Sequence, residues 1–180
     1  MTLKTGKKPE IDIFSKPFYG NLIRADMAIV REIPKSFDKG LTTQNLGKPS
    51  YEKIRVQHEG FVKAMSDLGL KVITLPADEK YPDIQFPRDT LLSYKGVLFN
   101  LNPGAEGRKK EVERNISDLA RVGISVKRFN YPDGAFVEGG DVLAFEHQDF
   151  VLIGISGNPD NVRTNKEGAK ALAEILLIGR

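Results

Sequence analysis

The sequence predicts an α/β fold built from repeated strand, hairpin and helix units, and three recurring features lead to that prediction. The end of a helix, a glycine turn and a strand are expected at 68–76 and again at 122–132. A Tyr-Pro-Asp loop begins at Tyr81 in the first copy and at Tyr131 in the second, and an aspartate that opens an apolar run comes after each loop. Because the features recur in the same order, they indicate an internal repeat.

The chain ahead of the first repeat is expected to contribute a strand, a loop and a helix. The strand is predicted at 21–31, the polar, glycine-containing loop near 35–49 and the helix at about 51–68. Four apolar residues of this helix are expected to face inward because they recur at helical spacing; they are Ile54, Phe61, Met65 and Leu68.

The first repeat unit predicts three strands and a helix. The strands are expected at Lys71–Leu75, Thr90–Tyr94 and Gly96–Asn100, and the helix at about Arg108–Arg121. Its apolar positions again follow helical spacing; they are Val112, Ile116, Leu119 and Ala120.

The second repeat unit predicts the same order of elements. Strands are expected at Ser125–Phe129, Asp141–Phe145 and Phe150–Ile155, and a helix from Asn165, a typical N-cap residue, to Ile178. The apolar face of that helix is predicted to hold Ala169, Leu172, Ala173 and Leu176. We expect Lys71–Leu75 and Ser125–Phe129 to be equivalent strands of superposable units.

No domain boundary is visible, so residues 1–180 are predicted to form one domain, and that domain is expected to be incomplete. The turn glycines stand at Gly69, Gly123 and Gly179, and no strand follows the third one. An interrupted repeat would leave strand edges and apolar faces exposed, for which a partner is expected. The alternative is that Gly179 simply caps the last helix.

Composition excludes several classes of protein and site. The 180 residues carry 27 Lys and Arg against 24 Asp and Glu, with no Cys and only two His. Disulfide frameworks and Cys/His metal clusters are therefore excluded, and a nucleic-acid partner is not expected from so small a net charge. No apolar run approaches the length of a membrane span. We expect a protein of the reducing cytoplasm with no metal and no other cofactor.

Acidic residues are the candidates for chemistry. If equivalent loops lie at one end of the fold, Asp83 and Asp89 converge with Glu138 and Asp141. Clustered carboxylates bind a metal through oxygen, share a proton or grip an organic cation such as a guanidinium. The alternative is that aspartate simply favours the turns between strands. The pair Gly139-Gly140 has two interpretations as well, a tight turn or a backbone cleared for a ligand.

Basic residues and histidines give weaker indications. Arg108 and Arg163 each stand near the start of a predicted helix, which is unfavourable for a cation and suggests that each meets an anion. Solvated surface charges are the alternative explanation. We expect His58 to be packed or partly exposed and His147 to lie exposed in a hairpin.

The motifs around these residues resemble the guanidine-modifying superfamily, which includes dimethylarginine dimethylaminohydrolases, arginine deiminases and amidinotransferases. Nearly the whole chain is similar to the N-terminal two thirds of a dimethylarginine dimethylaminohydrolase. The similarity lies in four segments that run in that family's order: Leu75-Pro76-Ala77-Asp78-Glu79, Asn102-Pro103-Gly104-Ala105 with Arg108-Lys109-Lys110-Glu111, Glu138-Gly139-Gly140-Asp141-Val142-Leu143, and Gly154-Ile155-Ser156 with Arg163-Thr164-Asn165.

The resemblance implies an α/β propeller of the pentein type, in which five quasi-equivalent units surround the active site. It also implies hydrolysis of a linear amidine: a cysteine thiolate attacks the guanidinium carbon, an amine leaves, and water hydrolyses the thiouronium intermediate to give citrulline. The family's cysteine and histidine lie in the C-terminal third, which has no counterpart in this sequence. The 180-residue chain alone is therefore expected to be inactive.

Site residues follow from the same resemblance. Glu138 resembles the carboxylate that orients the catalytic histidine. Asp89 resembles the clamp for the substrate guanidinium and Asp83 a second substrate-binding acid. The remaining substrate-binding positions are Arg108 and Arg163, near the substrate's amino-acid end, and Leu41, on a mobile loop over the site.

Two departures from the family pattern leave the substrate open. Arg88 stands where these enzymes usually have an acid, as in arginine deiminases, and an insertion at 157–162 precedes Arg163. The first hypothesis is a fragment of an amidine hydrolase that takes arginine or a methylated arginine, completed by a C-terminal fragment or a homo-oligomer. The second is a non-catalytic module that binds an arginine-like ligand or a protein partner.

Overall fold

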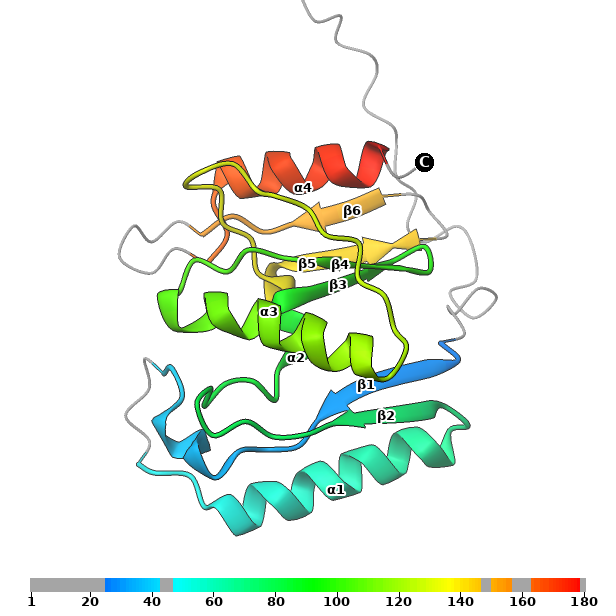
Figure 1. Cartoon of the computed structure of the whole chain (residues 1–180), viewed down its shortest axis with the longest axis vertical. Helices are drawn as coiled ribbons and strands as arrows, with labels where there is room; N and C mark the ends of the chain where they lie inside the picture. The colour runs from blue at the N-terminus through cyan, green and yellow to red at the C-terminus, as the bar shows by residue number, and fades with distance from the viewer. Residues whose placement is uncertain (1–24, 43–46, 147–149, 157–162, 179–180) are drawn as a thin grey trace, which may run out of the picture.

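The computed structural model describes residues 25–42, 47–146, 150–156 and 163–178. Figure 1 shows three tiers along the long axis of the molecule, each with a two-stranded sheet and one long helix. α1 lies at the bottom, α3 in the middle and α4 at the top. This arrangement is an α/β repeat, as predicted from the recurring motifs.

The first tier contains two parallel strands and the helix that connects them. β1 (Met27–Arg31) pairs with β2 (Lys71–Leu75) over their whole length. α1 (Tyr51–Asp67) lies between them in sequence, and the Ser50 side chain caps it by accepting the Lys53 N–H. The loop before α1 also contains a short 3-10 helix, η1 (Lys35–Lys39). Residues 21–24 of the predicted strand lie outside the described residues.

The second tier begins with a one-turn helix that the sequence analysis assigned partly to a strand. α2 (Pro87–Thr90) precedes the antiparallel hairpin of β3 (Leu91–Tyr94) and β4 (Val97–Asn100). Lys95 and Gly96, the two residues between the strands, both have positive φ. This is typical of the two-residue turns whose twist matches that of a hairpin. α3 (Glu106–Arg121) follows.

The predicted strand Ser125–Phe129 is wrong as a continuous strand. Only Lys127 pairs, in a parallel bridge to Phe99. Beyond it the Asn100 side chain replaces the backbone ladder, because its amide bonds to both the N–H and the carbonyl of Phe129. Residues 125–129 nevertheless correspond to β2 of the first tier. Each segment follows a long helix and runs parallel to the strand before that helix, β4 in the second tier and β1 in the first.

The third tier repeats the hairpin and the helix. A short 3-10 turn, η2 (Gly139–Asp141), leads into β5 (Val142–Phe145), which pairs antiparallel with β6 (Phe150–Ile153). α4 (Lys166–Ile178) follows. The Asn165 side chain accepts the Gly168 N–H at 2.8 Å, which confirms the predicted cap. His147 and the insertion at 157–162 lie outside the described residues.

The helix ends at Gly69 and Gly123 have the same hydrogen-bond pattern. Gly69 and Gly123 have positive φ, and in each tier the residue after the glycine donates back to a carbonyl five residues earlier, from Leu70 to Met65 and from Ile124 to Leu119. This is the glycine-capped helix end that L-residues with a side chain rarely form.

Two apolar clusters join the tiers. One packs the middle helix against strands of the first and second tiers and contains Leu75, Leu91, Val112, Ile116 and Leu119. The other packs the last helix against strands of the second and third tiers and includes Leu92, Phe99, Val142, Leu172 and Ile175. Ala120 and Ala173 are exposed, contrary to expectation, because the buried stripe of each helix is rotated away from them.

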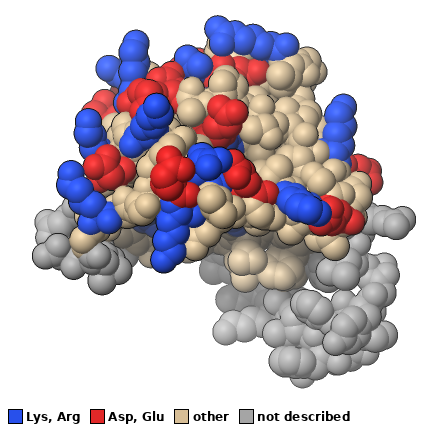
Figure 2. All heavy atoms as spheres, turned by 90° about the horizontal axis from the view of Figure 1, so that it is seen from below, with Lys and Arg blue, Asp and Glu red and all other residues tan. Residues whose placement is uncertain are grey.

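The expected inward face of α1 is not buried, since no residue of this helix is buried. Phe61 is 58% exposed, and Leu68 is 82% exposed where it caps the helix. Ile54, Phe61 and Met65 instead border an open groove of about 540 Å³ between α1, β1 and the loop at 85–89. The end of the molecule that carries α1 has mixed surface charge (Figure 2), including the i,i+4 ion pairs Arg55–Glu59 and Lys63–Asp67. None of the described helices is long and apolar enough to cross a membrane.

Candidate functional site

The first turn of α3 places a buried arginine among carboxylates. Arg108 is 5% exposed; its Nε donates to Glu111 Oε2 at 2.8 Å and its Nη1 donates to Asp89 Oδ2 at 3.1 Å. Its Nη2 lies 3.3 Å from the Asp83 carbonyl. The anions that Arg108 meets in the structure are thus the protein's own, and the arginine fixes the acidic loop 83–89 onto the helix.

The Asp83 carboxylate binds the loop that contains Gly40 and Leu41. Its Oδ2 accepts the Leu41 N–H at 2.9 Å. A Cβ on Gly40 would lie 2.5 Å from Asp83 Oδ1, so a larger residue at position 40 would require the Asp83 carboxylate to shift. The backbone of Leu41 therefore lies beside Asp83 of the acidic cluster.

The third tier contributes Glu138 and Arg163. Glu138 is 4% exposed, whereas the Arg163 side chain is 57% exposed, and Arg163 Nε lies 3.4 Å from Glu138 Oε2. Burial raises the pKa of Glu138, and the positive charges of Arg163 and Arg108 partly offset that effect. The carboxylate is held in a poorly solvated place, where a cation gains most from binding it.

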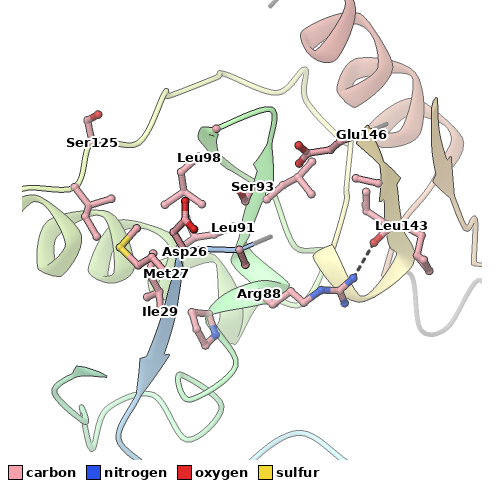
Figure 3. Close-up of a pocket in the computed structure, with 17 residues that line it drawn as sticks. Asp26, Met27, Ile29, Arg88, Leu91, Ser93, Leu98, Ser125, Leu143 and Glu146 are labelled. Carbon is pink, nitrogen blue, oxygen red and sulfur yellow. Dashed lines mark hydrogen bonds between the residues drawn. The ribbon is translucent and has the colours of Figure 1, made fainter. Parts of the chain in front are cut away.

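The two acidic loops meet at the glycine pair. A Cβ on Gly139 would lie 1.8 Å from the Arg88 carbonyl oxygen, and a Cβ on Gly140 would lie 3.6 Å from Asp89 Oδ1. Gly139 thus leaves room for another stretch of backbone, and Gly140 lies beside the Asp89 carboxylate. Across the same junction Arg88 Nη2 donates to the Val142 carbonyl at 2.9 Å (Figure 3).

Two hollows flank this junction. The groove beside α1 reaches Asp89, and half-buried His58 lines its far wall. The other hollow, of about 930 Å³, lies between β1, β3 and β5 and is lined mainly by aliphatic side chains, with Arg88 at its edge (Figure 3). Of the acids in the cluster, Asp89 borders one of these two hollows, the groove beside α1.

The structure brings the six predicted site residues into one region. Hydrogen bonds link Leu41, Asp83, Arg108 and Asp89. The Glu138–Arg163 pair adjoins them through the glycine junction, and the charge of Asp89 acts on Glu138. In the described part of the chain no group of three His, Cys, Asp or Glu side chains is placed to hold a metal ion.

Sequence reasoning missed two residues. Glu111 is 1% exposed and is held by Arg108, and the i,i+3 spacing of the two on the apolar stripe of α3 was the available signal. Thr164 is completely buried beneath Glu138. Thr164 stands in the Arg163-Thr164-Asn165 motif, which was the available signal, but the motif assigned it no role.

Glu111 makes the stability of the protein depend on pH. Burial raises its pKa to about 7, so between the unfolded value of ~4.3 and this value only the folded state holds the proton, and stability falls as the pH rises. Between about pH 5 and about pH 6.5 the cost is expected to be about 2 kcal/mol, at roughly 1.4 kcal/mol per unit. Urea unfolding of the wild type and Glu111→Gln at both pH values measures it. Relative to the wild type, the free energy of unfolding of Glu111→Gln should rise by that amount from the lower to the higher pH. A difference in stability between the two proteins that does not change with pH would contradict the raised pKa of Glu111.

Comparison with known proteins identifies relatives over most of the chain. The model of the family described as N,N dimethylarginine dimethylhydrolase, eukaryotic, matches residues 35–176. The N(G),N(G)-dimethylarginine dimethylaminohydrolase of Pseudomonas aeruginosa is 34% identical over 149 residues, 82% of this chain and 55% of that protein. The protein of the same name from Streptomyces coelicolor is 28% identical over 146 residues, 81% of this chain and 53% of that protein.

A solved structure is similar over the same region. The Pseudomonas aeruginosa enzyme, crystallised as a cysteine-to-serine mutant complexed with citrulline, gives a TM-score of 0.72 at 33% identity. The match covers 83% of this chain and 56% of that one. The chain spans about half the length of the curated relatives it matches.

Proposed function

The chain belongs to the N,N-dimethylarginine dimethylhydrolase family, and from that premise we propose that it forms the guanidinium-binding part of an amidine hydrolase. In this proposal residues 1–180 are one portion of a five-unit α/β propeller in the cytoplasm. The substrate is a small guanidino compound, arginine or a methylated arginine. The observation that carries the proposal is the meeting of two acidic loops at Gly139-Gly140, with Asp89 on one side and buried Glu138 on the other.

Each site residue has a role that its contacts allow. Asp89 clamps the guanidinium: Arg108 occupies its Oδ2, and its Oδ1 lies toward Gly140, which has no side chain to block a ligand. Arg163, mostly exposed, binds the carboxylate at the amino-acid end of the substrate. Arg108, Asp83 and Leu41 are the remaining proposed substrate-binding positions, and Arg108 and Asp83 also hold the loops in place.

Glu138 has a catalytic role in the proposal: it orients a histidine that handles protons while a cysteine thiolate attacks the guanidinium carbon. The thiolate displaces an amine, and water then cleaves the carbon–sulfur bond to leave citrulline. These 180 residues contain no cysteine, so the chain alone is proposed to be inactive. A second copy supplies no thiol either, which favours a complementing C-terminal fragment over a homo-oligomer as the source of the nucleophile.

The alternative function is a non-catalytic module that binds an arginine-like ligand or a protein partner through the same acids. Both functions need a cation clamp, and they differ in whether a cysteine-bearing polypeptide completes the site. Addition of such a polypeptide gives citrulline formation under the first hypothesis and none under the second.

Calorimetric titration with arginine tests the clamp in the chain as it stands. Asp89→Asn is expected to weaken binding by roughly 10- to 150-fold, the ~1.5–3 kcal/mol of a hydrogen bond to a charged group. Glu138→Gln should weaken it less, because its proposed partner is a histidine. Citrulline, which matches arginine in shape but carries no guanidinium charge, is the control ligand and should bind poorly to all three proteins.

Two results would contradict this assignment. Equal losses in Asp89→Asn and Glu138→Gln would indicate a shared cation or metal site in place of a guanidinium clamp. Tight arginine binding that Asp89→Asn leaves unchanged would remove Asp89 from the site.

A further inference from the structure

We propose that Thr164 is a positioning residue for Glu138, acting through the backbone of the glutamate and through Asp141. The Thr164 hydroxyl accepts the Glu138 N–H at 3.0 Å and donates to Asp141 Oδ2 at 2.7 Å. Thr164 has no exposed surface, so water does not compete for either bond. The inference rests on the proposed role of Glu138 and adds the device that places it.

The direction of the two hydrogen bonds is fixed by chemistry. An ionised aspartate only accepts and a backbone N–H only donates, so the threonine proton points to Asp141 and its lone pairs point to Glu138. A donor bound to a carboxylate is polarised and becomes a better acceptor for the next bond in the chain. The hydroxyl therefore couples Asp141 to the backbone of Glu138 in a single arrangement.

Backbone bonds extend this arrangement into a frame around the start of β5. The Asp141 carbonyl accepts the Gly154 N–H at 2.8 Å, and the Thr164 carbonyl accepts the Ser156 N–H at 2.8 Å. One residue further, the Asn165 side chain accepts the Phe136 N–H at 2.9 Å. The start of α4, the end of β6 and the loop before β5 are thus tied together behind Glu138.

The frame holds the backbone of Glu138, and among the described residues its carboxylate has a single ion pair. Its ionic contact, Arg163, is mostly solvent-exposed and lies at 3.4 Å, longer than a typical charge-assisted hydrogen bond. A carboxylate held from behind in this way stays available for a ligand or a second side chain while its position is fixed. This explains why the Arg-Thr-Asn and Glu-Gly-Gly-Asp motifs occur in one chain: they are the two halves of one structural unit.

Carboxyl-carbon NMR titration of Glu138 tests the inference, with the resonance assigned through Glu138→Gln. Thr164→Val keeps the shape of the side chain but removes the hydroxyl. It is expected to release Glu138 toward solvent and to lower its pKa toward the ordinary range of a glutamate, because burial is the main cause of the raised pKa. Thr164→Ser restores the hydroxyl and should restore the wild-type titration.

Thr90→Val is the matched control. Thr90 is another completely buried threonine whose hydroxyl both accepts, from Asn115, and donates, to the Pro87 carbonyl. Its loss should destabilise the fold comparably and leave the Glu138 titration unchanged. If Thr164→Val and Thr90→Val shift Glu138 alike, or if neither does, Thr164 contributes only to stability and the proposal is overturned.

Amide hydrogen exchange in the unmodified chain gives a second measurement that does not depend on a variant folding. The Glu138 N–H should be protected, whereas exchange as fast as that of exposed Asp133 would overturn the proposal. Neither measurement uses a guanidino ligand. The positioning role can thus fail while arginine binding holds, and arginine binding can fail while the positioning role holds.

Discussion

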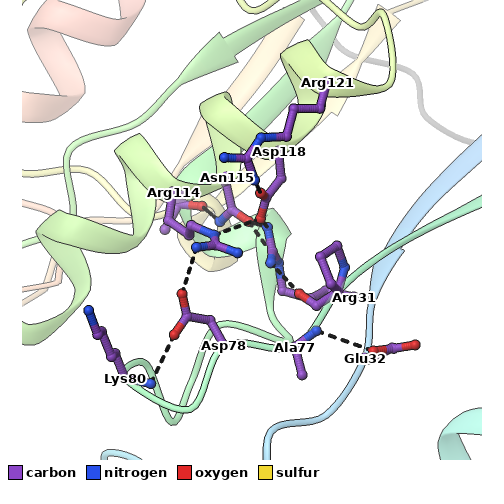
Figure 4. Close-up of polar contacts among 11 residues, drawn as sticks. Arg31, Glu32, Ala77, Asp78, Lys80, Arg114, Asn115, Asp118 and Arg121 are labelled. Atoms are coloured by element: carbon purple, nitrogen blue, oxygen red, sulfur yellow. Dashed lines mark hydrogen bonds and ion pairs between the residues drawn. The ribbon is translucent and has the colours of Figure 1, made fainter.

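Replacing Asp118 by leucine is expected to lower the free energy of unfolding by about 3–5 kcal/mol, the usual cost of leaving a buried charge without its partner. The abandoned charge is Arg31, which has no exposed surface and whose Nη2 donates to Asp118 Oδ2 at 2.7 Å. Figure 4 shows Arg31 from β1 reaching α3, where it also bonds to the Asn115 side chain; another of its donors bonds to the Pro76 carbonyl, just after β2. These neutral acceptors do not compensate the buried charge once the carboxylate is gone.

The other partners of Asp118 do not rescue the variant. Arg114 and Arg121 lie nearer the surface and can turn to water, whereas Arg31 cannot. Although burial alone would raise the pKa of Asp118, hydrogen bonds from Arg114 and Arg31 lower it, so the carboxylate is charged when it is lost.

Urea unfolding of three variants separates the buried charge from a general effect on α3. The double variant Arg31→Met with Asp118→Leu should recover at least half of the loss, because it removes both charges. Glu113 lies on the same helix as Asp118 and forms an exposed ion pair with Arg128. Glu113→Gln breaks that pair, and its free energy of unfolding should equal the wild-type value within experimental error. If the double variant were as unstable as Asp118→Leu, the cost would lie in packing and not in the unpaired arginine.

Much of the fold was predictable because hydrophobic spacing, glycine turns and caps act locally. β2, the hairpin β3–β4 and the helices α3 and α4 lie within a few residues of their predicted bounds. Errors arose where distant groups decide the outcome. The Asn100 amide, which breaks the ladder at Phe129, lies 29 residues away in sequence, and the uncovered face of α1 depends on what lies beside β1 and not on the helix pattern.

The candidate site divides in the same way. Motif order indicated that Asp89 and Glu138 belong to corresponding loops. It did not indicate that Arg108 would form ion pairs with Asp89 and Glu111. The Gly139-Gly140 motif had two interpretations because a glycine in a sequence does not show which group lies close to it. In the structure, the backbone of residue 88 lies against Gly139.

Gly139→Ala is therefore expected to cost about 3–4 kcal/mol of folding free energy, above the usual 1–3 kcal/mol of overpacking. The added Cβ would lie 1.8 Å from the Arg88 carbonyl oxygen and 2.9 Å from its carbonyl carbon, and neither is the flexible end of a side chain. Relief requires the two acidic loops to separate, which also moves Asp89 away from Glu138.

Gly140→Ala is the adjacent control, since its Cβ would meet Asp89 Oδ1 at an ordinary 3.6 Å. Chemical unfolding should place it within about 0.5 kcal/mol of the wild type, as for an exposed position. Arginine titration adds the functional readout. Gly139→Ala should weaken any binding even at temperatures where it is fully folded, because the clamp is pulled apart. Equal free energies of unfolding for the two alanine variants would mean that the two acidic loops are not in close contact at residue 139. The arrangement that brings Asp89 beside Glu138 would then have to depend on other contacts.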